Sequence, residues 1–175
     1  MRSATNNIRS FIGNLLGFDR ELAAIKKKYE KLLWDPSFEV YSHAGLEEIG
    51  KTLGDKYKTV AFIDFDDVRE LNNIYGYEEV NRIIRDTLKE LSSAAGVFIA
   101  RWFSGDEVVM LSRNDKDTTE NIVANAYLIG TFFNGMPFTY HIEVWDEKVR
   151  LFQFIDTLSR KVTQLKKEKD MAGAC

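Results

Sequence analysis

A short apolar run that ends in a group of acids constrains this chain more than any other stretch. Residues 60–63 read Val-Ala-Phe-Ile, and Asp64, Asp66 and Asp67 follow closely. A run of this length, with β-branched and aromatic residues, is typical of a buried strand. Carboxylates at a strand end suit Mg²⁺, which is usually held by one or two carboxylates plus substrate phosphates. We therefore expect a strand over residues 59–65, with Asp64 near its end as a candidate metal ligand.

A second acidic group lies in a tight turn between two further apolar runs. The sequence Ser-Gly-Asp-Glu at 104–107 separates expected strands at 97–102 and 107–112, which together predict a hairpin. Asp106 and Asp64 would converge if the first strand lay beside this hairpin. Two carboxylates there could hold one or two Mg²⁺ ions and stabilise an in-line phosphoryl displacement. Taken separately, each acidic group also fits a plain turn or a helix cap.

The first 34 residues carry apolar side chains at alternating spacings of three and four. These positions are Ile8, Phe11, Leu15, Phe18, Leu22, Ile25, Tyr29 and Leu32. The pattern is an a/d heptad seam, which indicates either a dimerising coiled coil or an amphipathic helix folded onto its own domain. Gly13 and Gly17 weaken the first half, so we expect a firm helix over about 19–33 behind a frayed or kinked lead.

The remainder of the chain alternates helical and strand patterns. Ser42 is a suitable N-cap for a helix over 43–53 that ends at Gly54, and a capping box from Asp117 to Glu120 opens a later helix. Further expected elements are a helical turn at 69–74 closed by Gly76, helices at 78–93 and 117–132, a strand at 138–145 and a final helix from 151. The order predicts an α+β fold with helices on one or both faces of a sheet.

Size and charge limit the classes of function. With 175 residues the chain is long enough for one domain and an appendage, and we place the segments at 1–34, 35–170 and a disordered tail at 171–175. The net charge of −3 provides no basic surface for duplex nucleic acid. We expect no membrane span, because no run of about 18 apolar residues is present, and the lone Cys175 excludes an internal disulfide. A cytoplasmic location is the expectation.

Both acidic stretches resemble the GGDEF domain, the fold of the diguanylate cyclases. The family pattern Asp-hydrophobic-Asp-x-Phe-Lys-x-x-Asn resembles residues 64–72, Asp-Phe-Asp-Asp-Val-Arg-Glu-Leu-Asn, and the signature turn resembles Ser-Gly-Asp-Glu-Val at 104–108. Asp35-Pro36 and Gly45-Leu46 resemble the family's entry segment. Two separated motifs in the correct order are far more specific than either alone. The resemblance implies a palm-type, ferredoxin-like central antiparallel sheet flanked by helices, with an N-terminal amphipathic helix.

The resemblance also implies an activity. In the family, two subunits face each other, and each 3′-hydroxyl attacks the α-phosphate of the other's nucleoside triphosphate with release of pyrophosphate. This chain would then be a homodimeric nucleotidyltransferase that condenses two GTP molecules into a cyclic dinucleotide second messenger. Asp64, the Phe65 carbonyl and Asp106 would hold Mg²⁺, or Mn²⁺ in its place, with Glu107 beside them as a further catalytic acid. Facing sites favour the dimeric interpretation of the heptad seam.

Substrate contacts follow from the same resemblance. Backbone amides near Asp67 and Val68 would contact the phosphates, with Arg69 in the place of a family Lys. Lys166 falls where the family has a phosphate-binding Lys, although its Lys-rich run alone indicates a solvated surface. Asn72 matches a residue that binds the base, and its alternative is an Asn that bonds the backbone of a helical turn.

One departure from the family bears on the choice of base. Asn81 replaces the Asp that accepts from guanine, and an amide offers one acceptor and two donors in place of two acceptors. A guanine donor would lose its partner or the base would change its pose, so ATP or mixed substrates are an alternative to GTP. For Asn81 itself the alternative is a surface helix position. The family's inhibitory Arg-x-x-Asp is absent, with Ala95 and Phe98 in those places, and we interpret His141 as structural.

Other classes of function remain consistent with the sequence. A degenerate domain could bind a nucleotide without turnover and signal through the N-terminal helix. Alternatively, the helix at 8–32 could be the working part of an interaction protein whose domain is a scaffold. Palm-type polymerases share the two-metal arrangement, so a linear dinucleotide is also a consistent product. The intact set of Asp64, Asp106 and Glu107 favours an enzyme.

Overall fold

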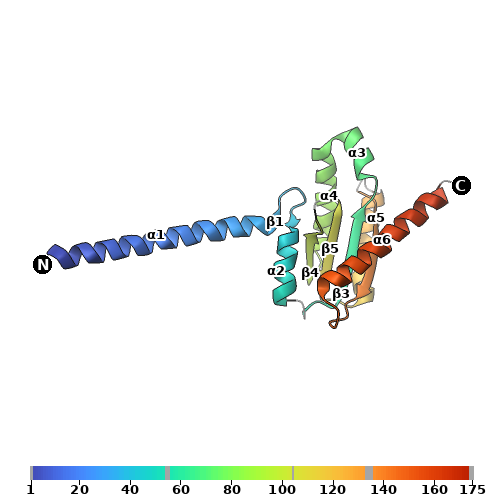
Figure 1. Cartoon of the computed structure of the whole chain (residues 1–175). Coiled ribbons are helices and arrows are strands. Elements are labelled where there is room, and N and C mark those ends of the chain that lie inside the picture. Colours follow the sequence, from blue (N-terminus) through green and yellow to red (C-terminus); the bar gives the residue numbers. More distant parts are fainter. Residues whose placement is uncertain (1, 54–55, 104, 133–135, 174–175) are drawn as a thin grey trace.

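A long helix and a domain built on one sheet make up the chain in the computed structural model, which describes residues 2–53, 56–103, 105–132 and 136–173. Helix α1 (Arg2–Leu32) projects away from the domain (Figure 1). It is continuous through Gly13 and Gly17, so the expected kink is absent. Each glycine costs a helix only about 1 kcal/mol, which does not interrupt a helix that continues on both sides.

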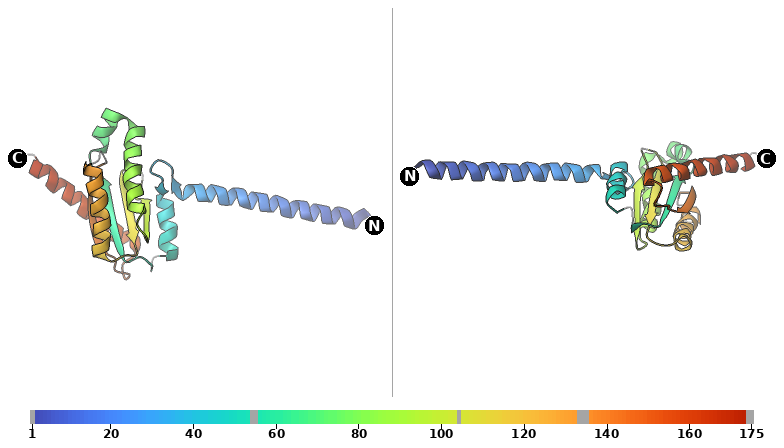
Figure 2. Two further views of the ribbon diagram at one scale, coloured as in Figure 1. Left: turned by 180° about the vertical axis from the view of Figure 1, so that it is seen from behind. Right: turned by 60° about the horizontal axis from the view of Figure 1, so that its bottom comes forward.

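The apolar stripe of α1 is exposed over its described length, and Tyr29 near its end hydrogen-bonds with Glu48 of the domain. Its described members are Phe18, Leu22, Ile25, Tyr29 and Leu32, all of them exposed. The helix extends clear of the domain in both views of Figure 2, so the alternative of a helix folded onto its own domain is wrong for this stripe. Positions 8, 11 and 15 lie outside the residues whose side chains the structure describes.

A six-stranded sheet forms the middle of the domain. Its strands are β1 (Trp34–Asp35), β2 (Val40–Tyr41), β3 (Thr59–Phe65), β4 (Val97–Arg101), β5 (Glu107–Ser112) and β6 (Phe138–Val144), in the order β1-β2-β4-β5-β3-β6. The four longer strands are antiparallel in a ferredoxin-like arrangement, as expected. The short β1–β2 ribbon was not predicted, and it joins the sheet through a parallel pairing of β2 with β4.

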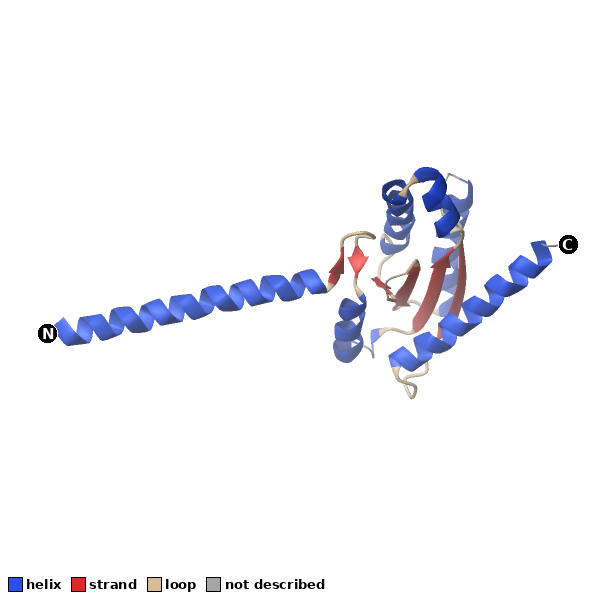
Figure 3. Ribbon diagram, turned by 45° about the horizontal axis from the view of Figure 1, so that its top comes forward, coloured by secondary structure: helices blue, strands red, loops and turns tan. Residues whose placement is uncertain are grey.

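Helices cover both faces of the sheet, and each face has its own apolar core. Helices α4 (Tyr77–Ser92) and α5 (Lys116–Phe132) lie on one face, and α2 (His43–Leu53) and α6 (Leu151–Gly173) lie on the other (Figure 3). Ile63 and Phe65 of β3 belong to the first core, and Val60 and Phe62 to the second. Because strand side chains alternate, Asp64 falls on the α6 face. Helix α3 (Val68–Tyr75) follows β3 directly and ends at Gly76, as expected.

Two helix ends differ from the sequence-based expectation. Oδ1 of Asp115 accepts a hydrogen bond from the Thr118 amide at 2.8 Å, so the cap of α5 is Asp115 and the capping box expected at Asp117 is wrong. Helix α6 includes residues 171–173, where a disordered tail was expected. Gly54, Ser104 and Cys175, which entered the sequence analysis, lie outside the described residues.

The end of α1 is bonded to the start of α2. The Ser42 amide donates to the carbonyl of Leu33 at 2.9 Å, and the Ser42 hydroxyl donates to the carbonyl of Leu32. The same hydroxyl accepts from the Gly45 amide at 3.2 Å, which confirms Ser42 as the cap of α2. A Cβ at Gly45 would lie 2.5 Å from the Leu33 carbonyl oxygen, so this approach requires glycine.

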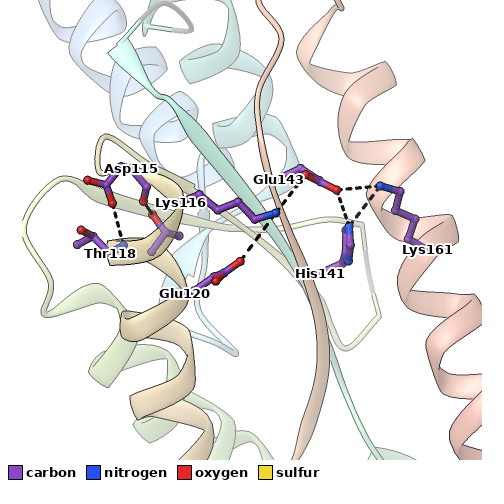
Figure 4. A network of polar contacts seen from close by, with 8 residues as sticks. Asp115, Lys116, Thr118, Glu120, His141, Glu143 and Lys161 are labelled. Atoms are coloured by element: carbon purple, nitrogen blue, oxygen red, sulfur yellow. Dashed lines mark hydrogen bonds and ion pairs between the residues drawn. The ribbon is translucent and has the colours of Figure 1, made fainter.

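A network of charged side chains ties α5 and α6 to the edge strand β6 (Figure 4). Oε1 of Glu143 lies 3.0 Å from Nζ of Lys161 and 3.0 Å from Nε2 of His141, and Oε2 lies 3.4 Å from Nζ of Lys116. His141 thus has a carboxylate partner in a structural contact. Within the described part of the chain, none of the helices has the length and apolar character needed to cross a membrane.

Candidate active site

Pairing of β3 with β5 brings the two acidic stretches together. Asp64 lies opposite Glu107 in the antiparallel register, and the Phe65 amide donates to the carbonyl of Asp106 at 3.3 Å. Asp64 and Glu107 share the face on which α6 packs, because their neighbours two residues along belong to the α2/α6 core. The hairpin therefore lies beside the first strand, which was the condition for the acids to converge.

Helix α6 places a lysine directly among these acids. Nζ of Lys166 lies 2.5 Å from Oδ1 of Asp64 and 3.1 Å from Oδ1 of Asp66. The same ammonium lies 3.0 Å from the carbonyl oxygen of Phe65. Only 27% of the Lys166 side chain and 16% of the Asp64 side chain are exposed. The interpretation of Lys166 as a solvated surface charge is therefore wrong.

Asp66 is fixed from a second direction by residues that the sequence analysis did not single out. Oγ1 of Thr139 lies 3.0 Å from both carboxylate oxygens of Asp66, and Nζ of Lys169 lies 2.7 Å from that hydroxyl. Lys169 also lies 3.4 Å from Oδ2 of Asp66. Lys166 and Lys169 are three positions apart and so share one face of α6. That shared face was the only signal in the sequence that could have paired them.

Burial is the main influence on the pKa values around Asp64, and neighbouring charges modify it. Burial raises the pKa of Asp64, Lys166 opposes this rise, and the charges of Asp106 and Asp66 add to it. Burial, then the charges of Asp64 and Asp106, raise the pKa of Glu107. Burial alone would lower the pKa of Lys166, but its hydrogen bonds and ion pairs with Asp64 and Asp66 leave it raised. Lys166 therefore offsets only part of the cost of burying these acids.

The donor set fits magnesium. The Asp64 carboxylate, the Phe65 carbonyl and the Asp106 carboxylate are hard oxygen ligands, and an ammonium already contacts the first two. Among the described residues, no group of three or more His, Cys, Asp or Glu side chains could hold a metal by itself. A metal here would therefore use the backbone carbonyl and substrate phosphate oxygens as well, which is common for Mg²⁺.

A cavity of about 630 Å³ adjoins the acids. Asp106 lines it together with Val68 and Arg69 of α3, and Asn72 and Asn81 face it from α3 and α4. Four of the expected substrate-binding residues thus share one cavity with an expected metal ligand. Asn81 is half-buried in its lining, so it is more than a surface helix position.

The start of α3 lies at this cavity. Asp67 precedes the helix with φ 56° and ψ 22°, a left-handed conformation that turns the chain out of β3. The first amides of a helix have no partner within it and favour phosphate groups. Asp67 itself and Lys166 are not among the residues that line the cavity. Lys166 belongs to the acid cluster instead.

Asn72 carries an unsatisfied acceptor. Its Oδ1 is the one buried side-chain nitrogen or oxygen, among the residues described, that has no hydrogen-bond partner. A buried acceptor without a partner costs about 1–3 kcal/mol. This oxygen does not bond the backbone of its helical turn, which was the alternative to base binding.

Arg101 is a further residue of the cavity that the sequence analysis missed. Its guanidinium lies 2.8 Å from Oδ2 of Asp35, donates to the carbonyl of Gly105 at 2.8 Å, and stacks 4.1 Å from the centre of the Phe38 ring. These contacts hold the β1–β2 ribbon against the β4–β5 turn. Asp35 and Arg101 are 66 positions apart, and no local pattern pairs them.

Comparisons with known proteins support the fold. No family profile matches the sequence, and no curated protein matches it. The coiled coil and GGDEF domain of DgcB from Caulobacter crescentus, solved in complex with c-di-GMP, superposes with a TM-score of 0.69 at 12% identity, covering 91% of this chain and 95% of that chain.

Two further solved structures have a similar fold. A microbial GGDEF domain solved with cyclic di-GMP gives a TM-score of 0.68 at 16% identity, over 78% of this chain and 94% of the other. The diguanylate cyclase SiaD of Pseudomonas aeruginosa, in complex with its activator SiaC, gives 0.64 at 12% identity, over 95% and 75%. At these identities the likeness shows the fold alone, and that fold is the one found in GGDEF domains.

Proposed function

We propose that this chain, which has the GGDEF fold, is a Mg²⁺-dependent nucleotidyltransferase. It would condense two nucleoside triphosphates, with GTP preferred, into a cyclic dinucleotide. The observation that carries the proposal is one cavity that both Asn72, whose buried Oδ1 has no hydrogen-bond partner, and Asp106 line, beside Asp64. A purine edge supplies the N–H donor that Asn72 lacks. Two of the similar structures were solved with c-di-GMP, which supports this class of ligand.

The binding roles follow from the cavity. The base would lie against Asn72 and Asn81, and the phosphates would lie at the start of α3, near Val68 and Arg69. Asn81 offers one acceptor and two donors, so it does not select guanine as a carboxylate would. ATP and mixed substrates therefore stay open as alternatives to GTP.

The acids supply the chemistry. Mg²⁺ held by Asp64, the Phe65 carbonyl and Asp106, or Mn²⁺ in its place, would neutralise charge on the transferring phosphoryl group. The pKa of Glu107 is raised by burial and by its acidic neighbours, which suits it to accept the proton of the attacking 3′-hydroxyl. An oxygen–phosphorus bond forms at the α-phosphate as the bond to pyrophosphate breaks. The same exchange at the facing subunit closes the ring.

A second copy of this chain completes the reaction. One cavity of this kind would bind one nucleotide, and the cyclic product needs two. The exposed stripe on α1 has the heptad spacing of a two-stranded coiled coil. We therefore propose a homodimer that α1 holds together.

The test is product identification with matched variants. Purified protein is incubated with Mg²⁺ and GTP, ATP or both, and products are identified by mass spectrometry. Wild type should form a cyclic dinucleotide, whereas Asp64→Ala and Asp106→Ala should form none while keeping their melting temperatures. Glu147→Ala, at an exposed acid outside the site, serves as the control. Product from either site variant would refute the metal assignment.

One observation favours a second candidate, a nucleotide-binding module without turnover. The Lys166 ammonium pairs directly with Asp64, and a permanent pair would withhold that carboxylate from a metal. This candidate predicts tight GTP binding with no product, even with Mn²⁺ and a confirmed dimer.

A further inference from the structure

Lys166 occupies the position of a bound cation within the acid cluster. Its Nζ contacts Asp64 Oδ1 at 2.5 Å and the Phe65 carbonyl oxygen at 3.0 Å. These are two of the three groups to which the proposed function assigns the metal. The pair is largely shielded from water, since only 16% of the Asp64 side chain is exposed, so solvent screens it little.

Two cations that contact the same oxygens repel each other. Mg²⁺ requires oxygen contacts of about 2.0–2.1 Å and near-ideal octahedral geometry. A divalent ion in contact with Asp64 and the Phe65 carbonyl would lie beside the ammonium of Lys166, and the two would repel each other at contact distance. Binding of the metal should therefore displace the ammonium from these two oxygens.

Lys166 has a second partner within reach. Asp66 Oδ1 lies 3.1 Å from the same Nζ, and Thr139 and Lys169 hold the Asp66 carboxylate in place. If the Lys166 ammonium leaves Asp64, it can therefore stay paired with the Asp66 carboxylate, which lies at the end of the site where α3 begins. The start of α3 is also where the phosphates would bind.

We propose that Lys166 is an internal competitor for the metal site, which leaves Asp64 and the Phe65 carbonyl when a divalent cation binds and then serves the triphosphate. The proposal rests on the metal site of the proposed function. It makes metal and nucleotide cooperative, because the ammonium that leaves Asp64 becomes available to phosphate oxygens. By linkage, the nucleotide must then raise metal affinity by the same factor.

Direct measurement of metal binding tests this without any turnover. Mn²⁺ is titrated into the full-length protein and followed by electron paramagnetic resonance of the free ion, alone and with a non-hydrolysable GTP analogue. The variants are Lys166→Met, Lys166→Gln and Asp64→Asn. Lys167→Met, at the neighbouring exposed lysine of α6, controls for the change in net charge. Melting temperatures confirm that each variant is folded.

Removal of the competitor should tighten metal binding. We expect the Mn²⁺ dissociation constant of Lys166→Met and Lys166→Gln to fall at least fivefold relative to Lys167→Met in the absence of nucleotide. We also expect the nucleotide to improve Mn²⁺ affinity in wild type by a larger factor than in either Lys166 variant. Asp64→Asn should abolish the site.

The failures of the two proposals are distinguishable. If wild type binds Mn²⁺ through Asp64 and the Lys166 variants bind it equally or more weakly, Lys166 is no competitor and the metal site stands. If the nucleotide helps wild type and the Lys166 variants equally, the coupling is refuted. If neither wild type nor the variants bind Mn²⁺ with or without nucleotide, the proposed function falls and this inference falls with it.

Discussion

Replacement of Glu143 by Gln tests whether the network at the sheet edge stabilises the fold. Hydrogen bonds from Lys161, and then from His141 and Lys116, lower the pKa of Glu143 from its usual 4.5 to about 2. That difference of about 2.5 units corresponds to about 3.4 kcal/mol, at about 1.36 kcal/mol per unit.

Solvent reduces this figure considerably. The exposed fractions are 33% for the Glu143 side chain, 45% for Lys161 and 38% for Lys116. Exposed ion pairs contribute little, so we expect Glu143→Gln to lower the free energy of unfolding by about 1 kcal/mol. For a chain of this size, about 1 kcal/mol lowers the melting temperature by about 2–4 °C.

The stabilisation by Glu143 should be present at neutral pH and be lost in acid. Because the folded-state pKa of Glu143 lies below its unfolded value, its contribution is complete above about pH 4.5 and is lost as the pH falls towards about 2. The difference in unfolding free energy between wild type and Glu143→Gln should therefore be constant from pH 7 to about 5.5 and should shrink below pH 4.5.

Urea denaturation at several pH values, in low and high salt, measures this difference. Glu147→Gln, at an exposed acid in the turn after β6, is the matched control and should behave as wild type at every pH. Equal stabilities of Glu143→Gln and wild type at pH 7 would refute the reasoning. A difference that persists unchanged at pH 3 would also refute it, because the loss would then come from packing.

Three further predictions concern other parts of the molecule. Gly45→Ala should destabilise the protein by roughly 1–3 kcal/mol in urea denaturation, because the Cβ of the new alanine would meet the Leu33 carbonyl. Gly17→Ala is the matched control: its Cβ would meet nothing within 4 Å, so the change should be neutral or stabilise by up to about 1 kcal/mol. Asn72→Ala should leave the unfolding free energy within about 1 kcal/mol of wild type, since Oδ1 has no hydrogen bond to lose. The same change should weaken GTP binding about tenfold in calorimetry, and unchanged binding would contradict the role of Asn72 in binding the base. The double variant Leu22→Glu, Ile25→Glu should convert a dimer to a monomer by light scattering with no change in domain melting; an unchanged mass would argue against α1 as the dimer contact.

Local patterns in the sequence predicted most of the helices and strands. The order of the strands in the sheet depends on long-range strand pairing, which these patterns do not specify. The run at 60–63 identified β3, and the acids at its end identified the candidate site, because alternation and turn residues act over a few positions. The convergence of Asp64 with Asp106 depended on strand order, which no short-range pattern specifies. The β1–β2 ribbon has two residues in each strand, too few for any periodicity to appear.

Side chains that reach across the fold were the least predictable. Lys166 meets Asp64 over 102 positions, and nothing in its Lys-rich run distinguishes it from its exposed neighbours. Its contact arises from the packing of α6 over the sheet, which a single sequence does not specify. Similarly, Asp115 and Asp117 are both good caps, and tertiary packing selected the first.

The junction between α1 and α2 couples the long helix directly to the domain. With 31 residues, α1 is about 46 Å long, and the carbonyls of its last residue, Leu32, and of the next residue, Leu33, accept hydrogen bonds from Ser42, just before α2. Gly45 of α2 packs closely against this end, since a Cβ there would lie only 2.5 Å from the Leu33 carbonyl oxygen. A tilt of about 5° at this base moves the far end of α1 by about 4 Å, given that length. These contacts are the route by which a tilt of the helix would reach α2, whose Leu46 packs in the core beneath α6.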